Sequence, residues 1–148
     1  MNFHGITKAS FVDGVGVRTV LWVSGCEHHC DGCHNASFWD PCSGREFMDS
    51  DLAYLIDCIS LPYIDGLTLS GGDPMHPENR ETVREIVRRA KDVTGKSIWM
   101  YTGYLWEQIK DDPVMEYVDY VVDGKYKKDL KPATYRGSLN QRIIKVRE

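Results

Sequence analysis

The sequence predicts an α/β fold built mainly on parallel strands, and three observations support this. Stretches with strand-like and helix-like patterns alternate along the 148 residues. The central strands recur at intervals of about thirty residues, as expected of βαβ units. Residues capable of chemistry follow the strands, which is where α/β proteins carry their sites. We therefore expect one functional edge, at the carboxyl ends of the strands.

Length and composition indicate one ordinary globular domain, residues 1–148. Hydrophobic residues make up 42% of the chain and charged residues 27%, enough apolar material to bury a core without disulfides. A formal net charge of −4 argues against a general nucleic-acid binder. The sequence contains neither an apolar run of membrane-spanning length nor a signal-peptide core, so a cytoplasmic location is expected.

The first part of the chain is expected to form two strands and a helix. Thr19–Ser24 is nearly all apolar and rich in β-branched and aromatic residues, so it should be a buried strand. Ser50 can cap a helix. The apolar face of that helix is expected to carry Leu52, Leu55, Ile56 and Ile59. Gly66–Ser70 is expected to be a second, short strand.

The rest of the chain alternates in the same way. Pro77 and the acidic residues after it can open a second helix, which Gly95 ends. The inner face of this helix is expected to carry Val83, Ile86, Val87, Ala90 and Val93. A weaker helical pattern over Tyr104–Met115 is interrupted at Asp112-Pro113. The remaining strands are expected at Ser97–Tyr101, at Val118–Val122 and, along an edge, at Gln141–Val146.

Four segments with unusual residues follow the four expected inner strands. They are Gly25-Cys26, Gly71-Gly72-Asp73-Pro74, Thr102-Gly103-Tyr104 and Asp123-Gly124-Lys125. Because strands must end in turns, glycine and aspartate are common at such places. Turn formation does not explain why cysteines also gather there. We therefore expect the four segments to converge on one site.

The cysteines are clustered and odd in number. Of five in the chain, Cys26, Cys30 and Cys33 lie within eight residues. Clustered thiols in a reducing compartment usually bind metal or perform redox chemistry, whereas a disulfide framework would be spread along the chain. Cys58 lies on the apolar side of the first expected helix and should belong to the core. The role of Cys42, in a loop, is open.

Two kinds of metal centre fit the cysteine spacing. Three thiolates can hold a 4Fe–4S cluster and leave one iron open for a substrate. A structural zinc site would need a fourth ligand, which His28, His29 or His34 could supply. A thioredoxin-type disulfide has less support, because the setting of such a motif is missing. Otherwise His28 and His29 are expected to face solvent, and His34 could pack against a bound ligand.

The turn Gly71-Gly72-Asp73-Pro74 is the second candidate binding element. Two glycines let the backbone approach a ligand closely, Asp73 adds an acceptor, and Pro74 fixes the turn. Such a turn suits a positively charged amino group. It is not a phosphate loop, because no Lys-Ser/Thr pair follows it.

The cysteine spacing and the turn Ser70–Pro74 together resemble the radical S-adenosylmethionine superfamily. The resemblance implies a 4Fe–4S cluster, one per chain, held by Cys26, Cys30 and Cys33. It implies S-adenosylmethionine as second cofactor, and no catalytic side chain beyond the ligands of these two groups. The implied cofactor contacts are Gly32, Cys33, His34, Gly71, Gly72 and Asp73. The implied fold is a partial, incomplete β/α barrel with mostly parallel strands, open at one side to a large substrate.

Further segments narrow the resemblance to glycyl-radical-enzyme activases. Asp13–Arg18, Val23–Cys26 and Cys33-His34-Asn35 are similar to that family. Trp99–Tyr104, Val122–Lys125 and Tyr135–Gln141 are similar to the members that act on anaerobic ribonucleoside-triphosphate reductase. Val15 stands where the family usually has proline, and His34 where those members usually have tyrosine.

The resemblance implies an oxidoreductase that activates a partner enzyme. A reduced cluster cleaves S-adenosylmethionine, and the radical formed removes hydrogen from a glycine of the partner. The expected partners are the large subunit of anaerobic ribonucleoside-triphosphate reductase, a reductant such as flavodoxin and, for a homodimer, a second copy of the chain. Neither nucleic acid nor a membrane is expected. The alternatives are another glycyl radical enzyme or a small molecule as substrate, as in a deazapurine synthase, and a zinc-stabilised binding module.

The segment 125–142 is basic and lacks an obvious element. It carries Lys125, Lys127, Lys128, Lys131, Arg136 and Arg142 against Asp129. Such a segment can be a solvated loop. Our hypothesis is that it docks an acidic or polar surface of the partner.

Overall fold

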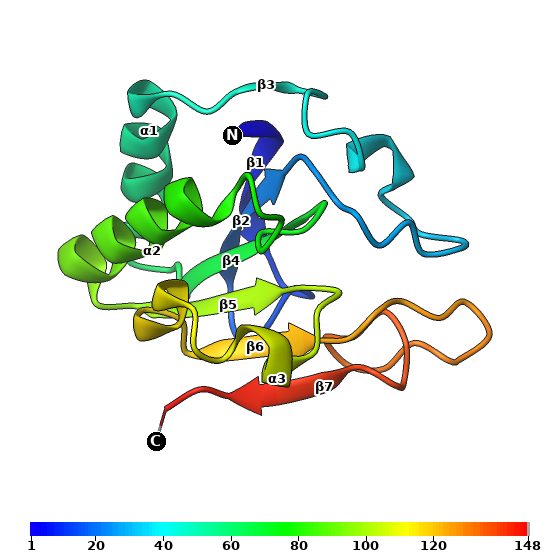
Figure 1. Cartoon of the computed structure of the whole chain (residues 1–148). Helices are drawn as coiled ribbons and strands as arrows, with labels where there is room; N and C mark the ends of the chain where they lie inside the picture. Colours follow the sequence, from blue (N-terminus) through cyan, green and yellow to red (C-terminus); the bar gives the residue numbers. More distant parts are fainter. Residues whose placement is uncertain (148) are drawn as a thin grey trace.

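The structure, a computed structural model, describes residues 1–147, which form a mixed α/β fold around one seven-stranded sheet (Figure 1). The strands are β1 (Asn2–Ser10), β2 (Arg18–Val23), β3 (Arg45–Glu46), β4 (Gly66–Gly71), β5 (Ser97–Tyr101), β6 (Tyr120–Asp123) and β7 (Arg142–Lys145). The helices are η1 (Ala36–Phe38), α1 (Asp49–Ile59), α2 (Arg80–Thr94), α3 (Trp106–Ile109) and η2 (Pro113–Glu116).

The sheet has a parallel centre and antiparallel margins. Its strand order is β3-β1-β2-β4-β5-β6-β7. The neighbours β2, β4, β5 and β6 pair in parallel, whereas β1, β3 and β7 pair antiparallel with their neighbours. Three parallel pairings in sequence order confirm the expected βαβ arrangement. Closure of this sheet into a partial barrel, and the single domain 1–148, stay predictions.

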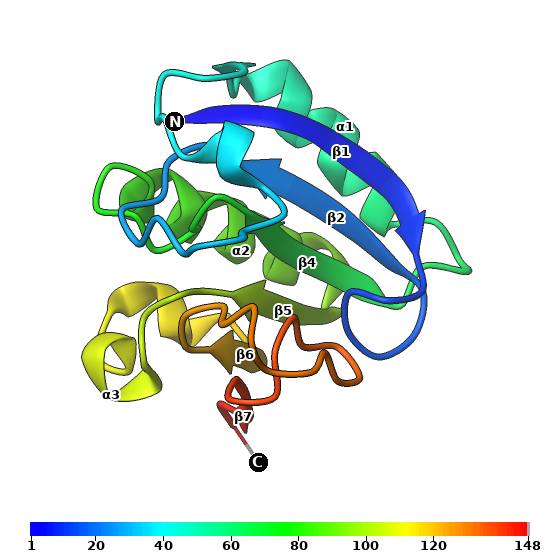
Figure 2. The same ribbon diagram turned by 90° about the vertical axis from the view of Figure 1, so that its right-hand side faces the viewer.

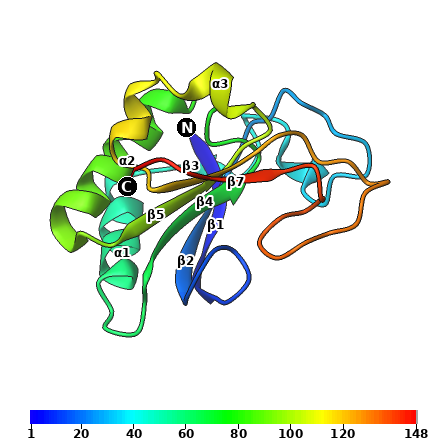
Figure 3. The ribbon, with the colours of Figure 1, turned by 90° about the horizontal axis from the view of Figure 1, so that it is seen from below.

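The two faces of the sheet differ because side chains alternate along each strand. One face packs against the helices and holds the apolar core. Its strand members are Leu21, Val23, Leu67, Leu69, Ile98, Met100 and Val121. The opposite face carries polar and aromatic side chains, among them Trp22, Ser70 and Tyr101. Figure 3 shows α1 and α2 on one side of the sheet and the long loops on the other.

The expected elements are confirmed, with differences in detail. All four expected inner strands, the edge strand and both main helices are present. Two strands, β1 and β3, were not expected from the sequence. Helix α2 begins at Arg80 rather than Pro77, because residues 77–79 form a turn before it. Its expected inner-face residue Val93 is 54% exposed, so that assignment was wrong. In the described residues, no helix has the length and apolarity needed to cross a bilayer.

Helix α1 begins differently from the expectation, because Asp51 and not Ser50 satisfies its first turn. The N-cap position is Met48, and the Asp51 carboxylate accepts a 2.8 Å hydrogen bond from its N–H. Arg45 donates to the same carboxylate, with a 2.6 Å N–O distance, and this lowers the pKa of Asp51 below its ordinary value. Asp51 is buried although charged, because Arg45 and the helix end surround it.

Replacing Asp51 with alanine is expected to lower the free energy of unfolding by about 1–2 kcal/mol, since it removes a cap and a charged hydrogen bond. Chemical denaturation at pH 7 measures this loss, with Asp49→Ala as the control because Asp49 is exposed in the same turn. The pKa of Asp51 is lowered in the folded state. Its contribution is therefore present at neutral pH and is lost as pH falls below about 4. Equal stabilities of both variants at pH 7 would contradict this account of the helix start.

Candidate metal and cofactor site

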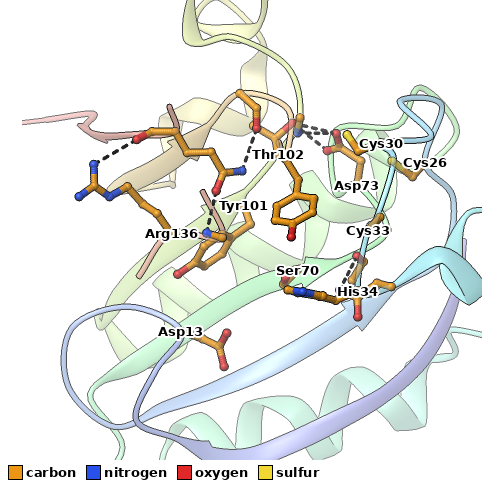
Figure 4. A pocket seen from close by; sticks show the side chains of 18 of the residues that line it. Asp13, Cys26, Cys30, Cys33, His34, Ser70, Asp73, Tyr101, Thr102 and Arg136 are labelled. Atoms are coloured by element: carbon orange, nitrogen blue, oxygen red, sulfur yellow. Dashed lines mark hydrogen bonds between the residues drawn. The ribbon is translucent and has the colours of Figure 1, made fainter. Parts of the chain in front are cut away.

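The three clustered cysteines line one large cavity at the carboxyl ends of the parallel strands. The cavity has a volume of about 750 Å³. The segments expected to converge do so here, because Gly72, Thr102 and Gly124 line it as well. Its floor includes Trp22, Ser70 and Tyr101 from the polar face of the sheet. Figure 4 shows Cys26, Cys30 and Asp73 at one end of this cavity and Asp13 at the other.

The loop that carries the cysteines, residues 25–39, is closed by backbone hydrogen bonds. Gly25 N–H donates to the Phe38 carbonyl at 2.8 Å, and Cys26 N–H donates to the Trp39 carbonyl at 3.0 Å. These bonds return the chain to its starting point beside β2. Cys33 N–H donates to the Cys30 carbonyl at 3.1 Å and makes a tight turn between the two later cysteines. Figure 2 shows this loop standing beyond the end of β2.

The thiols are partly buried and unfavourable as isolated thiolates. Removal from water raises the pKa of Cys26 to about 11, and the nearby Asp73 carboxylate adds to this rise. Burial also raises the pKa of Cys30. All five cysteines are free. Because metal ions bind the thiolate form, a cationic centre would supply the positive charge that these two groups lack.

The three clustered cysteines are not arranged as the ligands of a single zinc ion. Ligand sulfurs about 2.3 Å from one zinc lie roughly 3.8 Å apart. Cys26, Cys30 and Cys33 do not form a group this compact within the described residues; the group of metal-ligating atoms within 4.8 Å of one another is Cys26, His28 and Asp73. A zinc site on the three cysteines with a histidine would therefore need the loop to contract. In a cluster the three sulfurs would each bind a different iron, so they need not lie this close together.

The cavity also holds buried hydrogen-bond donors that suit a ligand with acceptor groups. Among residues 1–147, the indole N–H of Trp39 and the Nε–H of Arg136 are buried without a partner. Both residues line the cavity. A buried donor without a partner costs free energy, so a bound molecule with carboxylate or hydroxyl oxygens would relieve it. A cofactor with an amino acid and a ribose moiety has such oxygens.

The glycine turn after β4 is shaped first by the chain itself. Gly71 has φ +115°, and a Cβ there would lie 2.5 Å from the Val23 carbonyl oxygen. A Cβ on Gly72 would lie 2.7 Å from the Gly25 carbonyl oxygen. The two glycines therefore let the turn pack against the strand end that leads into Cys26. From the sequence alone, their small size was expected to serve only the approach of a ligand.

The Asp73 carboxylate joins three segments of the site. It is 2% exposed. Oδ1 accepts hydrogen bonds from Met75 N–H and from the Thr102 hydroxyl, both at 2.8 Å. Oδ2 accepts from Gly103 N–H at 3.0 Å and lies 2.6 Å from Nε2 of His28. The side chain thus holds together the cysteine loop, the β4 turn and the end of β5.

The histidines of the loop lie in three different environments. The side chain of His28 is only 7% exposed, so its expected solvent position was wrong. His29 is exposed, as expected, and stacks on Trp39 with ring centroids 4.5 Å apart. His34 lines the cavity and tilts against Tyr126. Gly32 does not line the cavity, because it faces the side chain of Lys128.

Several cavity residues were not predicted to be site residues from the sequence. Asn35 donates a 3.1 Å hydrogen bond to the Gly71 carbonyl and ties the cysteine loop to the turn. Phe11 and Val12 lie at the rim and are both 72% exposed. Tyr101 donates a 2.6 Å hydrogen bond to the Tyr135 carbonyl, and burial raises the pKa of Tyr101. Only the placement of residues after strands could have suggested some of these positions.

Comparison with known proteins identifies the family to which the chain is similar. A family model described as a 4Fe-4S single cluster domain matches residues 12–144. An anaerobic ribonucleoside-triphosphate reductase-activating protein of Enterobacteria phage T4 is 44% identical, over 97% of this chain and 93% of its own length. Proteins of the same name from Escherichia coli K12 and Vibrio cholerae are 37% and 39% identical. Those matches cover 99% and 97% of this chain, and 100% and 97% of the two proteins.

Proposed function

Because the chain belongs to the family of anaerobic ribonucleoside-triphosphate reductase-activating proteins and matches the 4Fe-4S single cluster domain, we propose that it activates such a reductase by radical chemistry. The observation that carries the proposal is the cavity in which Cys26, Cys30 and Cys33 meet the turn after β4. The likeness extends over nearly the whole chain, so the proposal concerns the complete activity and not a shared module alone.

Different residues of the cavity would bind the two cofactors. Cys26, Cys30 and Cys33 would hold a 4Fe–4S cluster. The turn Gly71–Asp73, with His34 at the rim, would hold S-adenosylmethionine through its backbone, because the Asp73 carboxylate is already occupied by donors of the chain. When bound and reduced, the cluster would supply the electron that breaks the S–C5′ bond, so that a hydrogen atom can be taken from a glycine of the reductase. The chain's own contribution is to orient the bound groups and exclude water at the buried end of the cavity. Free thiols need a reducing compartment, which supports a cytoplasmic location.

The experiment that tests this function uses the reconstituted protein and a reductase. The protein is loaded anaerobically with iron and sulfide, reduced, and mixed with S-adenosylmethionine and the large subunit of anaerobic ribonucleoside-triphosphate reductase. We expect methionine, 5′-deoxyadenosine and an electron paramagnetic resonance doublet of a glycyl radical on the reductase. Cofactor cleavage without the doublet would favour a small-molecule substrate. Absence of cleavage would contradict radical chemistry altogether.

The basic segment 125–131 offers a docking surface beside the cavity. Lys128 is engaged within the chain, because its Nζ lies 2.7 Å from the Asp31 carboxylate of the cysteine loop. Lys127 and Lys131 are exposed and have no ion-pair partner among residues 1–147. Lys128 is therefore unsuitable for testing docking, since reversing its charge would place a second acidic group beside Asp31 of the cysteine loop.

The double variant Lys127→Glu/Lys131→Glu is expected to weaken reductase binding about tenfold while leaving cofactor cleavage unchanged. The two introduced glutamates would repel an acidic partner surface and would no longer attract a polar one. Titration calorimetry at low ionic strength measures the affinity, and the exposed Lys110→Glu serves as a matched control. Unchanged affinity of the double variant would remove this segment from the interface.

A further inference from the structure

His28 occupies a socket built by two separate segments, the turn after β4 and the end of β5. Its Nε2 lies 2.6 Å from Oδ2 of Asp73, in the β4 turn. Its ring meets the Tyr104 ring edge-on, with centroids 4.6 Å apart and planes at 76°. A Cβ on Gly103 would collide with the imidazole. The Asp73 carboxylate, the Tyr104 ring and the space beside Gly103 together define one position for the imidazole.

The socket is a set of hydrogen bonds and not a vacant metal site. The ligating atoms of Cys26, His28 and Asp73 lie within 4.8 Å of one another, which would suit a single ion. A carboxylate has about four lone-pair positions. Met75, Thr102, Gly103 and His28 already use those of Asp73. An ion bound there would have to displace several of these buried donors, each of which would then lack a partner.

The contact between His28 and Asp73 affects the cysteine loop because of where His28 lies in the sequence. His28 lies midway between Cys26 and Cys30, and its neighbours Glu27 and His29 are exposed. Cys26 is fixed on one side by the Trp39 carbonyl. The buried imidazole therefore fixes the path of the chain from the first cysteine to the second. It also connects that path to the turn after β4 and to the end of β5.

We propose that His28 is a positioning residue that sets the separation of Cys26 and Cys30 before the cluster binds and keeps it afterwards. The part about the cluster rests on the function proposed above. The part about the loop does not, because the contact is made by the chain alone. The two can therefore fail separately.

The loop contact is tested in the cluster-free protein by hydrogen exchange. In His28→Ala, we expect the amides of Cys26 and Cys33, which donate to the Trp39 and Cys30 carbonyls, to exchange about tenfold faster, because the buried imidazole no longer holds the loop in place. His29→Ala removes an exposed neighbouring imidazole and is expected to leave these amides within about twofold of the wild type. Equal exchange in the two variants would overturn the proposal.

Gly103→Ala tests the same contact without changing the cysteine loop. Its new methyl group would expel the His28 ring, so the exchange of the Cys26 and Cys33 amides should rise as in His28→Ala. In the double variant the methyl group fills space that alanine at 28 has vacated, so no further increase is expected. Additive effects of the two substitutions would show that they act independently and would overturn the proposal.

The consequence for the cluster is read from iron and from cofactor binding. After reconstitution, His28→Ala is expected to lose iron to a chelator about tenfold faster than wild type, as removal of an outer partner of a metal site does. His28→Gln, whose amide can reach the Asp73 carboxylate, should restore most of the retention. Tighter S-adenosylmethionine binding by His28→Ala would overturn the proposal, because the imidazole would then be blocking the cofactor. Absorption spectroscopy showing imidazole bound to iron would also overturn it. Failure of the wild type to bind iron would instead contradict the proposed function, whereas the hydrogen-exchange result for the loop would still hold.

Discussion

Replacing Cys26, Cys30 or Cys33 with alanine is expected to reduce bound iron from about four atoms per chain to nearly none. Each thiolate would bind one iron of the cluster, and two remaining ligands cannot hold a cube with three protein-bound corners. Burial raises the pKa of Cys26 and of Cys30, so their thiolate forms are disfavoured until a cation offsets the charge. Iron and sulfide analysis after anaerobic reconstitution measures the loss.

Cys42→Ala and Cys58→Ala are the controls for this experiment. Cys42 is exposed in the loop before α1, and Cys58 is a core residue, 3% exposed, as the sequence predicted. Neither lines the cavity. Both variants should bind iron like the wild type, although Cys58→Ala should be slightly less stable because it leaves a small void. Full iron binding by a Cys26 variant, or its loss in the Cys42 variant, would contradict the ligand assignment.

The second large effect is expected at Gly71. Gly71→Ala should lower the free energy of unfolding of the cluster-free protein by about 3 kcal/mol, because alanine is strained at φ +115° and its Cβ would lie 2.5 Å from the Val23 carbonyl oxygen. Either the turn moves away from β2 or the backbone bears the strain. Denaturation by urea measures the loss.

Gly95→Ala separates the two causes. Gly95 ends α2 with φ +64°, and a Cβ there would meet nothing within 4 Å. Alanine at this position should lower the free energy of unfolding by about 1 kcal/mol, through the left-handed conformation alone. Equal losses in the two variants would mean that the close approach of the β4 turn to β2 contributes nothing to stability.

The sequence was most informative where local spacing decides the outcome. The cysteine spacing and the Gly-Gly-Asp-Pro turn were both recognisable, and parallel topology brought them to one cavity. Apolar runs located the inner strands, because a strand buried on both faces needs few polar residues. The core role of Cys58 followed from helical periodicity in the same way.

The sequence was least informative where distant residues decide the outcome. Strand β1 was missed because Asn2–Ser10 has no clear alternation; it forms by pairing with β2 and β3. His28 was expected in solvent because its neighbours are polar. Its burial depends on Asp73, 45 residues later, and on the missing side chain of Gly103. The prediction for Val93 was wrong for the opposite reason, since it fits the apolar period of α2 but is 54% exposed in the last turn of the helix.

A reducible cluster in this cavity should cleave S-adenosylmethionine. The most direct test is electron paramagnetic resonance of the anaerobically reconstituted, reduced protein before and after the cofactor is added, with product analysis of the same sample. The account predicts a 4Fe–4S signal that changes on addition, and formation of methionine and 5′-deoxyadenosine. A protein that contains zinc, gives no such signal and leaves the cofactor intact would contradict it.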